Sequence, residues 1–205
     1  MKKVRTKESR WALMVGAIVA VALSPLPVEA HLNSTGMGTV YDGLLHFLLS
    51  PEDILSVLAL ALLAGRRGAE HGRRELFVLP GAWLAGGLLG LTVTGPRGAA
   101  LTFVSFLLLG GLLAADVKLP LRATTALAGL IGLFHGYLNG AGMGRAADGA
   151  LALIGLVIAV FVVVALASSF AVSLRQMWAR IAVRVFGSWI VASGLLMIGW
   201  AVRRG

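Results

Sequence analysis

The chain has 205 residues, of which 58% are hydrophobic and 13% are charged, and its mean hydropathy is +0.89. A water-soluble domain of this size needs more charge on its surface, so the composition excludes a soluble fold and predicts an integral membrane protein. The net charge is +9, but the basic residues form short clusters between apolar segments, as topology signals do, which argues against a nucleic-acid-binding surface. Cysteine is absent, which excludes disulfides and thiolate metal sites.

The first thirty residues form a unit of their own. A lysine- and arginine-rich start precedes the apolar run 11–23, two prolines follow, and Val28-Glu29-Ala30 resembles a small-x-small cleavage site. We therefore predict a cleaved secretory signal peptide over residues 1–30, with an uncleaved anchor helix as the alternative. Both interpretations place residue 31 on the outer face. Cleavage would make His31 the new N-terminus, whose amine and imidazole could chelate a divalent metal together.

Residues 31–205 alternate apolar stretches with short polar breaks and are predicted to form one membrane domain. A helix needs about 20 residues to cross the hydrocarbon core. The breaks are too short to bury a soluble core. The pattern therefore predicts an all-α, polytopic membrane bundle of about six transmembrane helices, over residues 41–65, 76–94, 98–116, 121–138, 150–172 and 180–202.

The basic residues of the breaks predict the orientation of these helices. With residue 31 outside, the inner set is Arg66, Arg67, Arg73, Arg74, Lys118, Arg122, Arg175, Arg180 and Arg184, and the outer set is Arg97, Arg145, Arg203 and Arg204. This excess on the inside agrees with the positive-inside rule. We therefore expect a multi-pass protein of a bacterial-type inner or plasma membrane, with the mature N-terminus outside. The same topology places His71 in a cytoplasmic loop among four arginines, where we expect a solvated or lipid-headgroup role and not a ligand role.

Ionisable side chains lie within the first predicted span. Asp42 and His46 are four residues apart, and His46 and Asp53 are seven apart, so the three share one face of an ideal helix. Glu52 points elsewhere on that helix. Charged groups at bilayer depth are costly and mark pathways or binding sites. We interpret this face as a ladder of metal ligands.

The sequence Ser50-Pro51-Glu52-Asp53 argues against one continuous helix in this span. A serine followed by proline at the first helical position and then by acids is typical of a helix start. One interpretation is a pair of half-helices that meet within the membrane, as in the ion sites of transporters. The other is a short interfacial helix followed by a span that begins at this point, with both acids near the surface.

A second candidate region lies at the end of the fourth predicted span. It contains Phe134-His135-Gly136, with Asn139 one turn later. Imidazole is the commonest neutral metal ligand, and the adjacent glycine permits close approach of a neighbouring helix. Histidines on two spans, with carboxylates on one of them, predict a divalent metal site. Nitrogen and carboxylate donors without thiolate suit nickel, cobalt, zinc or manganese better than monovalent copper.

Glycines recur at three- and four-residue spacing in several spans, among them Gly86 and Gly90 in the second and Gly132 and Gly136 in the fourth. This spacing predicts close helix packing. No Walker-type Lys-Ser/Thr pair follows any of these glycines, so a phosphate loop is excluded. No HExxH pair or Ser/Lys dyad appears either, and we expect no enzymatic activity.

The stretch from His46 to Leu55 and the segment 134–140 resemble the HupE/UreJ family. These are small polytopic proteins associated with hydrogenase and urease systems and regarded as nickel or cobalt permeases or accessory proteins. In the family pattern a His is followed six and seven positions later by Asp and His, and a later span carries His-Gly-x-Ala-His-Gly. The resemblance implies that His46 is the first ligand, that Glu52 stands for the Asp, Asp53 for the second His and His135 for the first His of the later motif, and that Asn139 replaces its second His.

These replacements shift the expected site from nitrogen-rich toward oxygen-rich. The leading hypothesis is a transporter that captures a divalent transition metal, nickel or cobalt, on the outer face and passes it inward. The alternative is a non-transporting accessory protein in which the polar cluster is structural. The expected ligands are His46, Asp53 and His135, supplemented by Asp42, Glu52, Asn139 and His31. The expected partners are the lipid bilayer and the metal ion, with a membrane protein or a second copy as a further option; no prosthetic group is expected.

Overall fold

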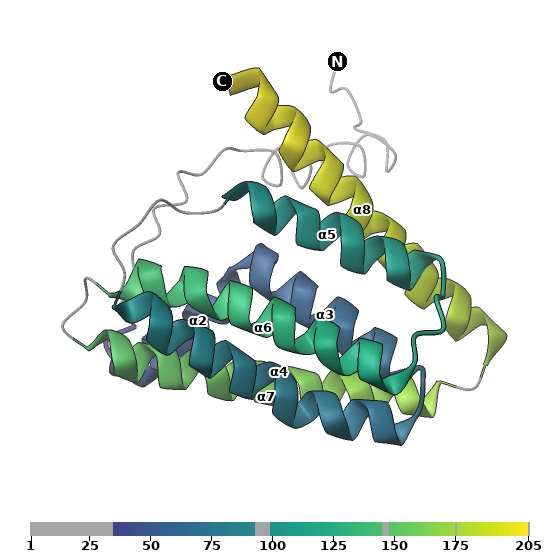
Figure 1. Cartoon of the computed structure of the whole chain (residues 1–205), viewed down its shortest axis with the longest axis horizontal. Coiled ribbons are helices and arrows are strands. Elements are labelled where there is room, and N and C mark those ends of the chain that lie inside the picture. The colour runs from purple at the N-terminus through teal and green to yellow at the C-terminus, as the bar shows by residue number, and fades with distance from the viewer. Residues whose placement is uncertain (1–34, 93–98, 145–147, 175, 205) are drawn as a thin grey trace, which may run out of the picture. The chain divides into compact units, whose positions relative to one another are not determined.

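The computed structural model describes residues 35–92, 99–144, 148–174 and 176–204 (Figure 1). The predicted signal peptide and His31 lie outside the described residues. Those ranges contain helices and no strand, which confirms the all-α class. The helices are α2 (Thr39–Leu49), α3 (Pro51–Gly65), α4 (Ala69–Leu91), α5 (Ala99–Ala114), α6 (Leu121–Met143), α7 (Gly149–Ser173) and α8 (Met177–Arg204).

Each predicted span coincides with one helix or, for the first span, with the pair α2 and α3. By length and apolarity alone, Gly149–Ser173 and Met177–Trp200 qualify as membrane spans among the described residues, and the bent pair Thr39–Leu49 and Pro51–Gly65 can count as a third. The first turns of α4 are rich in charge, and α6 contains a histidine and an asparagine within its apolar run. Helices that carry polar groups have lower hydropathy, so six transmembrane helices remain a prediction.

The first predicted span is broken at Ser50. Helices α2 and α3 meet there at 74°. Ser50 has an extended backbone, and Pro51 begins α3, where its missing N–H costs no helical hydrogen bond. The Ser50 hydroxyl donates to the carbonyl oxygen of His46 at 2.7 Å, which satisfies one of the free carbonyls at the end of α2. The predicted break at Ser50 is confirmed, whereas the pair of half-helices within the membrane and the interfacial helix followed by a span both stay predictions. The prediction of one straight ligand-bearing face is wrong, because that helix ends at Leu49.

Helices α4 and α6 approach closely through glycines. A Cβ added to Gly136 or Gly140 would collide with the backbone carbonyl oxygen of Trp83 or Gly87, both on α4. A Cβ on Gly86 would collide in the same way with the carbonyl of Leu133 on α6. The predicted role of the glycine stripes in packing is therefore confirmed for this helix pair, and it brings the His135 turn of α6 against α4.

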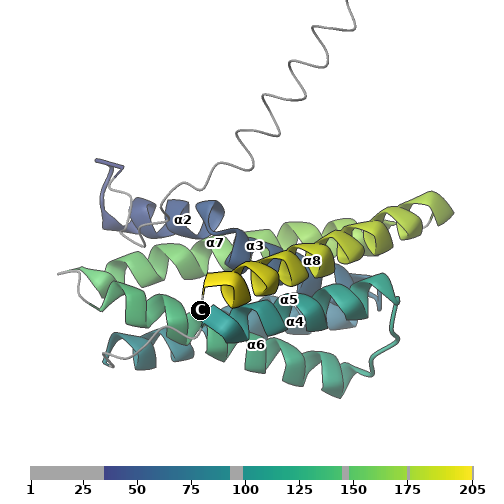
Figure 2. The ribbon, with the colours of Figure 1, turned by 90° about the horizontal axis from the view of Figure 1, so that it is seen from above.

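Helix α3 lies at the centre of the helices around it. It contacts α2, α4, α5, α6, α7 and α8. Helices α5 and α8 pack against each other, and Figures 1 and 2 show them side by side. Helix α4 packs against both α6 and α7. Any polar side chain on the inner face of α3 is therefore enclosed by several helices.

The turn after α3 is tied to the end of α5 by an ion pair. Both Nε and Nη2 of Arg66 donate to the carboxylate of Asp116, at 3.0–3.2 Å. Arg67 donates to the same carboxylate at 3.3 Å. Asp116 has a φ of 51°, a left-handed conformation that aspartate tolerates better than most residues. This contact fixes the end of the bundle that carries the arginine-rich turn.

Candidate functional site

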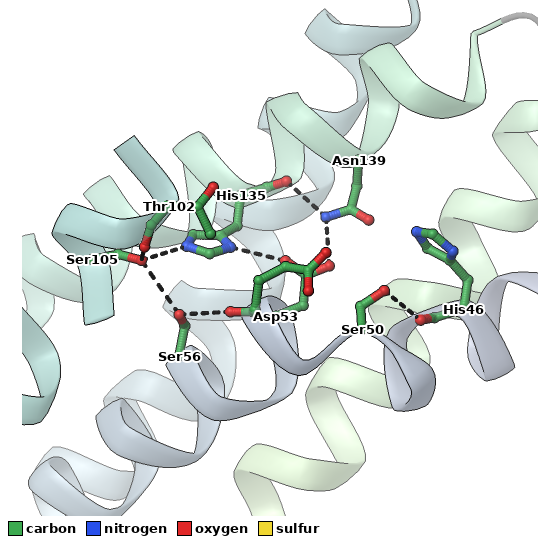
Figure 3. Close-up of polar contacts among 9 residues, drawn as sticks. His46, Ser50, Asp53, Ser56, Thr102, Ser105, His135 and Asn139 are labelled. Atoms are coloured by element: carbon green, nitrogen blue, oxygen red, sulfur yellow. Dashed lines mark hydrogen bonds and ion pairs between the residues drawn. The ribbon is translucent and has the colours of Figure 1, made fainter. Parts of the chain in front are cut away.

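Asp53 and His135 form a buried, hydrogen-bonded pair between α3 and α6. Nδ1 of His135 lies 2.8 Å from Oδ1 of Asp53, and the two side chains are 1% and 5% exposed. Asn139 lies one helical turn after His135, and its amide donates to Oδ2 of Asp53 at 2.9 Å and to the His135 carbonyl at 2.9 Å. Figure 3 shows the three side chains converging beside the break at Ser50. Both carboxylate oxygens of Asp53 therefore have a partner.

The break between α2 and α3 places the Asp53 carboxylate at the N-terminus of a helix. Asp53 belongs to the first turn of α3, together with Glu52. The N-terminus of a helix carries a partial positive charge, which stabilises acidic groups there. A straight helix through Ser50 would have no such N-terminus at this depth. The proline break therefore helps to keep a carboxylate inside the bundle.

The other ring nitrogen of His135 faces hydroxyl groups on α5. Nε2 lies 3.1 Å from Oγ of Ser105, and that hydroxyl also lies 2.7 Å from the carbonyl oxygen of Thr102. Oγ of Ser56 is 3.5 Å from Ser105 and donates to the Glu52 carbonyl. The polar cluster therefore runs across α6, α3 and α5 (Figure 3).

Aromatic rings cover the other sides of His135. Trp83 on α4 lies with its ring centroid 5.4 Å from the imidazole, and Phe134 lies 5.3 Å away, edge to face. Phe47 packs edge to face on Trp83 at 6.1 Å. Apolar walls exclude water and strengthen the electrostatic contacts inside them. The imidazole is therefore packed against aromatic rings on these sides.

This arrangement suits an imidazole that binds a metal ion. Histidine ligands commonly donate one ring N–H to a carboxylate, which fixes the ring and leaves the other nitrogen for the metal. Asp53 occupies the position of that carboxylate relative to Nδ1 of His135. In the structure Nε2 is engaged by Ser105, so an ion at this nitrogen would have to displace the hydroxyl.

Comparison with known proteins gives the family. The model of the HupE / UreJ protein family matches residues 18–197, which is most of the chain. The chain belongs to the HupE/UreJ family. Over 136 residues it is 26% identical to Protein HupE of Rhizobium leguminosarum bv. viciae, an alignment that covers 64% of this chain and 68% of the relative. No solved structure matches the chain.

The structure brings together a subset of the ligands expected from the HupE/UreJ resemblance, namely Asp53, His135 and Asn139. His46 lies on the α2 side of the break, and the side-chain hydrogen bonds of the cluster do not include its imidazole. Glu52 is half-buried and contributes its backbone carbonyl to Ser56. Asp42 accepts a hydrogen bond from the backbone N–H of Thr35.

The described side chains do not form a complete metal site. Among these residues, no group of three or more His, Asp or Glu side chains lies close enough to hold an ion together. The break separates His46 from the carboxylate that it was expected to join, which is the physical reason for the difference. For this HupE/UreJ chain, the wider ligand set stays a prediction.

Sequence reasoning missed several residues of the cluster. Ser105 and Ser56 are hydroxyl residues in apolar helices, where small polar side chains are common and carry little signal. Trp83 is one of five tryptophans, and no sequence pattern around it sets it apart from the others. Its place beside His135 follows from the packing of α4 on α6, where Gly136 faces the Trp83 carbonyl. His71, expected in a solvated loop, instead lies in the first turn of α4 with a buried Nε2.

Proposed function

We propose that this chain binds a divalent transition-metal ion at the Asp53–His135 cluster and passes it inward across the membrane, with nickel or cobalt as the expected cargo. The observation that carries the proposal is the buried Asp53–His135 pair at the break between two half-helices. Ionisable groups at such depth mark substrate paths in membrane proteins. Half-helices that meet inside the bilayer supply ion sites in transporters.

The proposed topology has six spans with the mature N-terminus outside. It is supported by the match of each of the six predicted spans to a described helix or pair of helices and by the excess of basic residues at the ends predicted to be inside. In this topology the cluster is reached from the outer side, and the ion pair of Arg66 with Asp116 lies at the inner end.

The donor set defines what the ion would meet. An ion that replaced the hydrogen bond between Nδ1 of His135 and Asp53 would meet one imidazole nitrogen, two carboxylate oxygens and the amide oxygen of Asn139, whereas an ion at Nε2 would leave Asp53 as the partner of Nδ1. This mixed nitrogen and oxygen set accepts first-row divalent ions and has no soft donor for monovalent copper. In the structure the polar groups of the cluster are hydrogen-bonded to one another, so an ion would have to replace some of these hydrogen bonds. His46 would join only if α2 moved relative to α3.

A second candidate function has its own support. The Asp53 carboxylate and both nitrogens of His135 already have hydrogen-bond partners, as expected of a polar network that only specifies helix packing. In that case the protein is an accessory membrane protein that docks with a partner. The HupE/UreJ family contains accessory or transport-type proteins, and no enzymatic activity is proposed.

The test is metal accumulation in cells that lack other nickel and cobalt uptake. Expression of the chain should raise cell-associated metal, and Asp53→Asn and His135→Gln should each abolish the rise at unchanged protein abundance. Asp148→Asn serves as the control, because it removes an exposed carboxylate in front of α7. Unchanged accumulation in both cluster variants would refute the transport proposal. Reduced abundance or loss of a co-purified partner would support the accessory function.

A further inference from the structure

A second group of buried polar side chains lies on α4, outside the cluster. Glu75 is 1% exposed, and neither of its carboxylate oxygens has a hydrogen-bond partner within the described part of the chain. His71 lies one helical turn earlier, and its Nε2 is also buried and without a partner. Side chains four apart share one face of a helix. Two unsatisfied metal-binding groups therefore lie next to each other.

The position of Glu75 relates it to the Asp53–His135 cluster. Three almost completely buried residues lie at four-residue spacing along α4, namely Glu75, Leu79 and Trp83. Trp83 packs against the imidazole of His135. Eight residues of helix correspond to about 12 Å, so Glu75 lies two turns from that level, toward the end of α4 that begins beside the arginine-rich turn. Leu79 separates the two polar groups on this stripe.

No ion pair among the described residues includes Glu75. Arg73 and Arg74 are on the same helix but are exposed. The arginines of the preceding turn, Arg66 and Arg67, are paired with Asp116. Helix α7 passes close at Gly72, where its nearest side chain is that of Ser168, a neutral hydroxyl. A buried carboxylate anion without a partner is strongly destabilising, and a proton or a bound cation removes that cost.

We propose that Glu75 and His71 form a second binding site for a divalent transition-metal ion, between the Asp53–His135 cluster and the arginine-bearing end of the bundle. One carboxylate and one imidazole are donors that such ions accept, with the Ser168 hydroxyl or water completing the shell. The direction of ion movement rests on the proposed function, but the binding site does not. Leu79 lies between Glu75 and Trp83 on this face of α4. An ion therefore occupies one of two separate positions, either at the Asp53–His135 cluster or at Glu75 and His71.

The experiment measures how many Co²⁺ ions the purified full-length chain binds in detergent, by equilibrium dialysis and by the visible absorption of the bound ion. The wild-type chain should bind about two ions. Glu75→Gln and Asp53→Asn should each remove one of them, and the spectrum of the remaining ion should differ between the two variants. Glu70→Gln is the matched control, since it removes an exposed carboxylate from the first turn of the same helix. It should leave both ions bound.

The outcomes separate this inference from the proposed function. If Glu75→Gln binds as much Co²⁺ as the wild type while Asp53→Asn loses its ion, the Glu75 site is refuted and the proposed function stands. Loss with Glu75→Gln alone would support the Glu75 site and refute the cluster as a binding site. A wild-type chain that binds no Co²⁺ would refute both.

A folding defect must be distinguished from loss of a ligand. Glu75→Asp keeps the carboxylate on a shorter side chain and should restore the second ion with an affinity at least tenfold weaker than the wild type. His71→Gln should weaken the same ion and leave the spectrum of the cluster ion unchanged. Glu75→Gln must first elute as a monodisperse protein, which shows that it is folded. If Glu75→Asp then binds no more Co²⁺ than Glu75→Gln, the carboxylate is not a ligand and the site is refuted.

Discussion

His135 and Asp53 are 82 residues apart in the chain, yet Nδ1 of one lies 2.8 Å from Oδ1 of the other. Two features of the fold bring them together. The break at Ser50 turns α3 so that its first turn enters the bundle, and the glycine contacts between α4 and α6 hold the His135 turn against Trp83. Mutations in either feature should therefore affect the pair without touching it directly.

Gly136→Ala should destabilise the bundle. The added methyl group would collide with the Trp83 carbonyl, which is backbone and has little room to move. Overpacking of this kind costs about 1–3 kcal/mol. The free energy of unfolding, measured by denaturant titration in detergent, should fall by that amount, and metal bound at the cluster should fall with it.

Gly142→Ala is the control for that measurement. Gly142 lies in the same helix, and nothing lies within 4 Å of the position of its Cβ. Alanine favours a helix over glycine by up to about 1 kcal/mol, so this variant should be equal to or more stable than the wild type. Equal effects of the two substitutions would contradict close packing at Gly136.

Asp53→Ala should cost more stability than Asp53→Asn. Removal of one partner from a buried hydrogen-bonded pair leaves the other partner unsatisfied, which costs about 1–3 kcal/mol and more where that group is charged. In Asp53→Asn the single amide oxygen can still accept one of the two hydrogen bonds, from His135 or from Asn139, so the loss should be smaller. The same unfolding titration measures both. A loss below about 1 kcal/mol in Asp53→Ala would mean that water reaches His135 in the variant.

The helical fold was predictable because the chemistry of the bilayer dictates it. Long apolar segments between polar breaks predicted helices at positions that α4, α6 and α7 occupy, and Pro51 after a serine predicted a helix start. The site was only partly predictable. The pairing of His135 with Asp53 depends on how α3 and α6 meet, and helical spacing along one segment contains no such information. The burial of Glu75 was not predictable for the same reason. In the sequence Glu75 immediately precedes the second predicted span, but in the structure it is almost completely buried.

Arg66 and Asp116 should show a coupling energy in a double-mutant cycle. The Arg66 side chain is 5% exposed and that of Asp116 25%, and the guanidinium makes several hydrogen bonds to the carboxylate. Hydrogen bonds between charged groups in such positions contribute roughly 1–3 kcal/mol. Arg66→Gln and Asp116→Asn should therefore each lower the thermal midpoint, and the double variant should lose less than the sum. Strict additivity would show that the contact contributes nothing.

Trp83→Phe and Trp83→Ala should separate the two roles of the Trp83 side chain. Its ring packs on His135 and Phe47, while its buried Nε1–H has no hydrogen-bond partner among the described residues. Phenylalanine keeps most of the ring contact and removes the unsatisfied donor, so the two effects offset each other and the free energy of unfolding should change by less than about 1 kcal/mol. Alanine leaves a cavity beside the imidazole and should cost about 3–5 kcal/mol. Metal binding at the cluster should survive the first substitution and weaken with the second, because His135 then loses the wall that holds its ring. The contrary result is that Trp83→Phe destabilises the protein as much as Trp83→Ala. That result would show that the indole N–H donates a hydrogen bond in the membrane-embedded protein, to a water molecule on the inner side of the cluster.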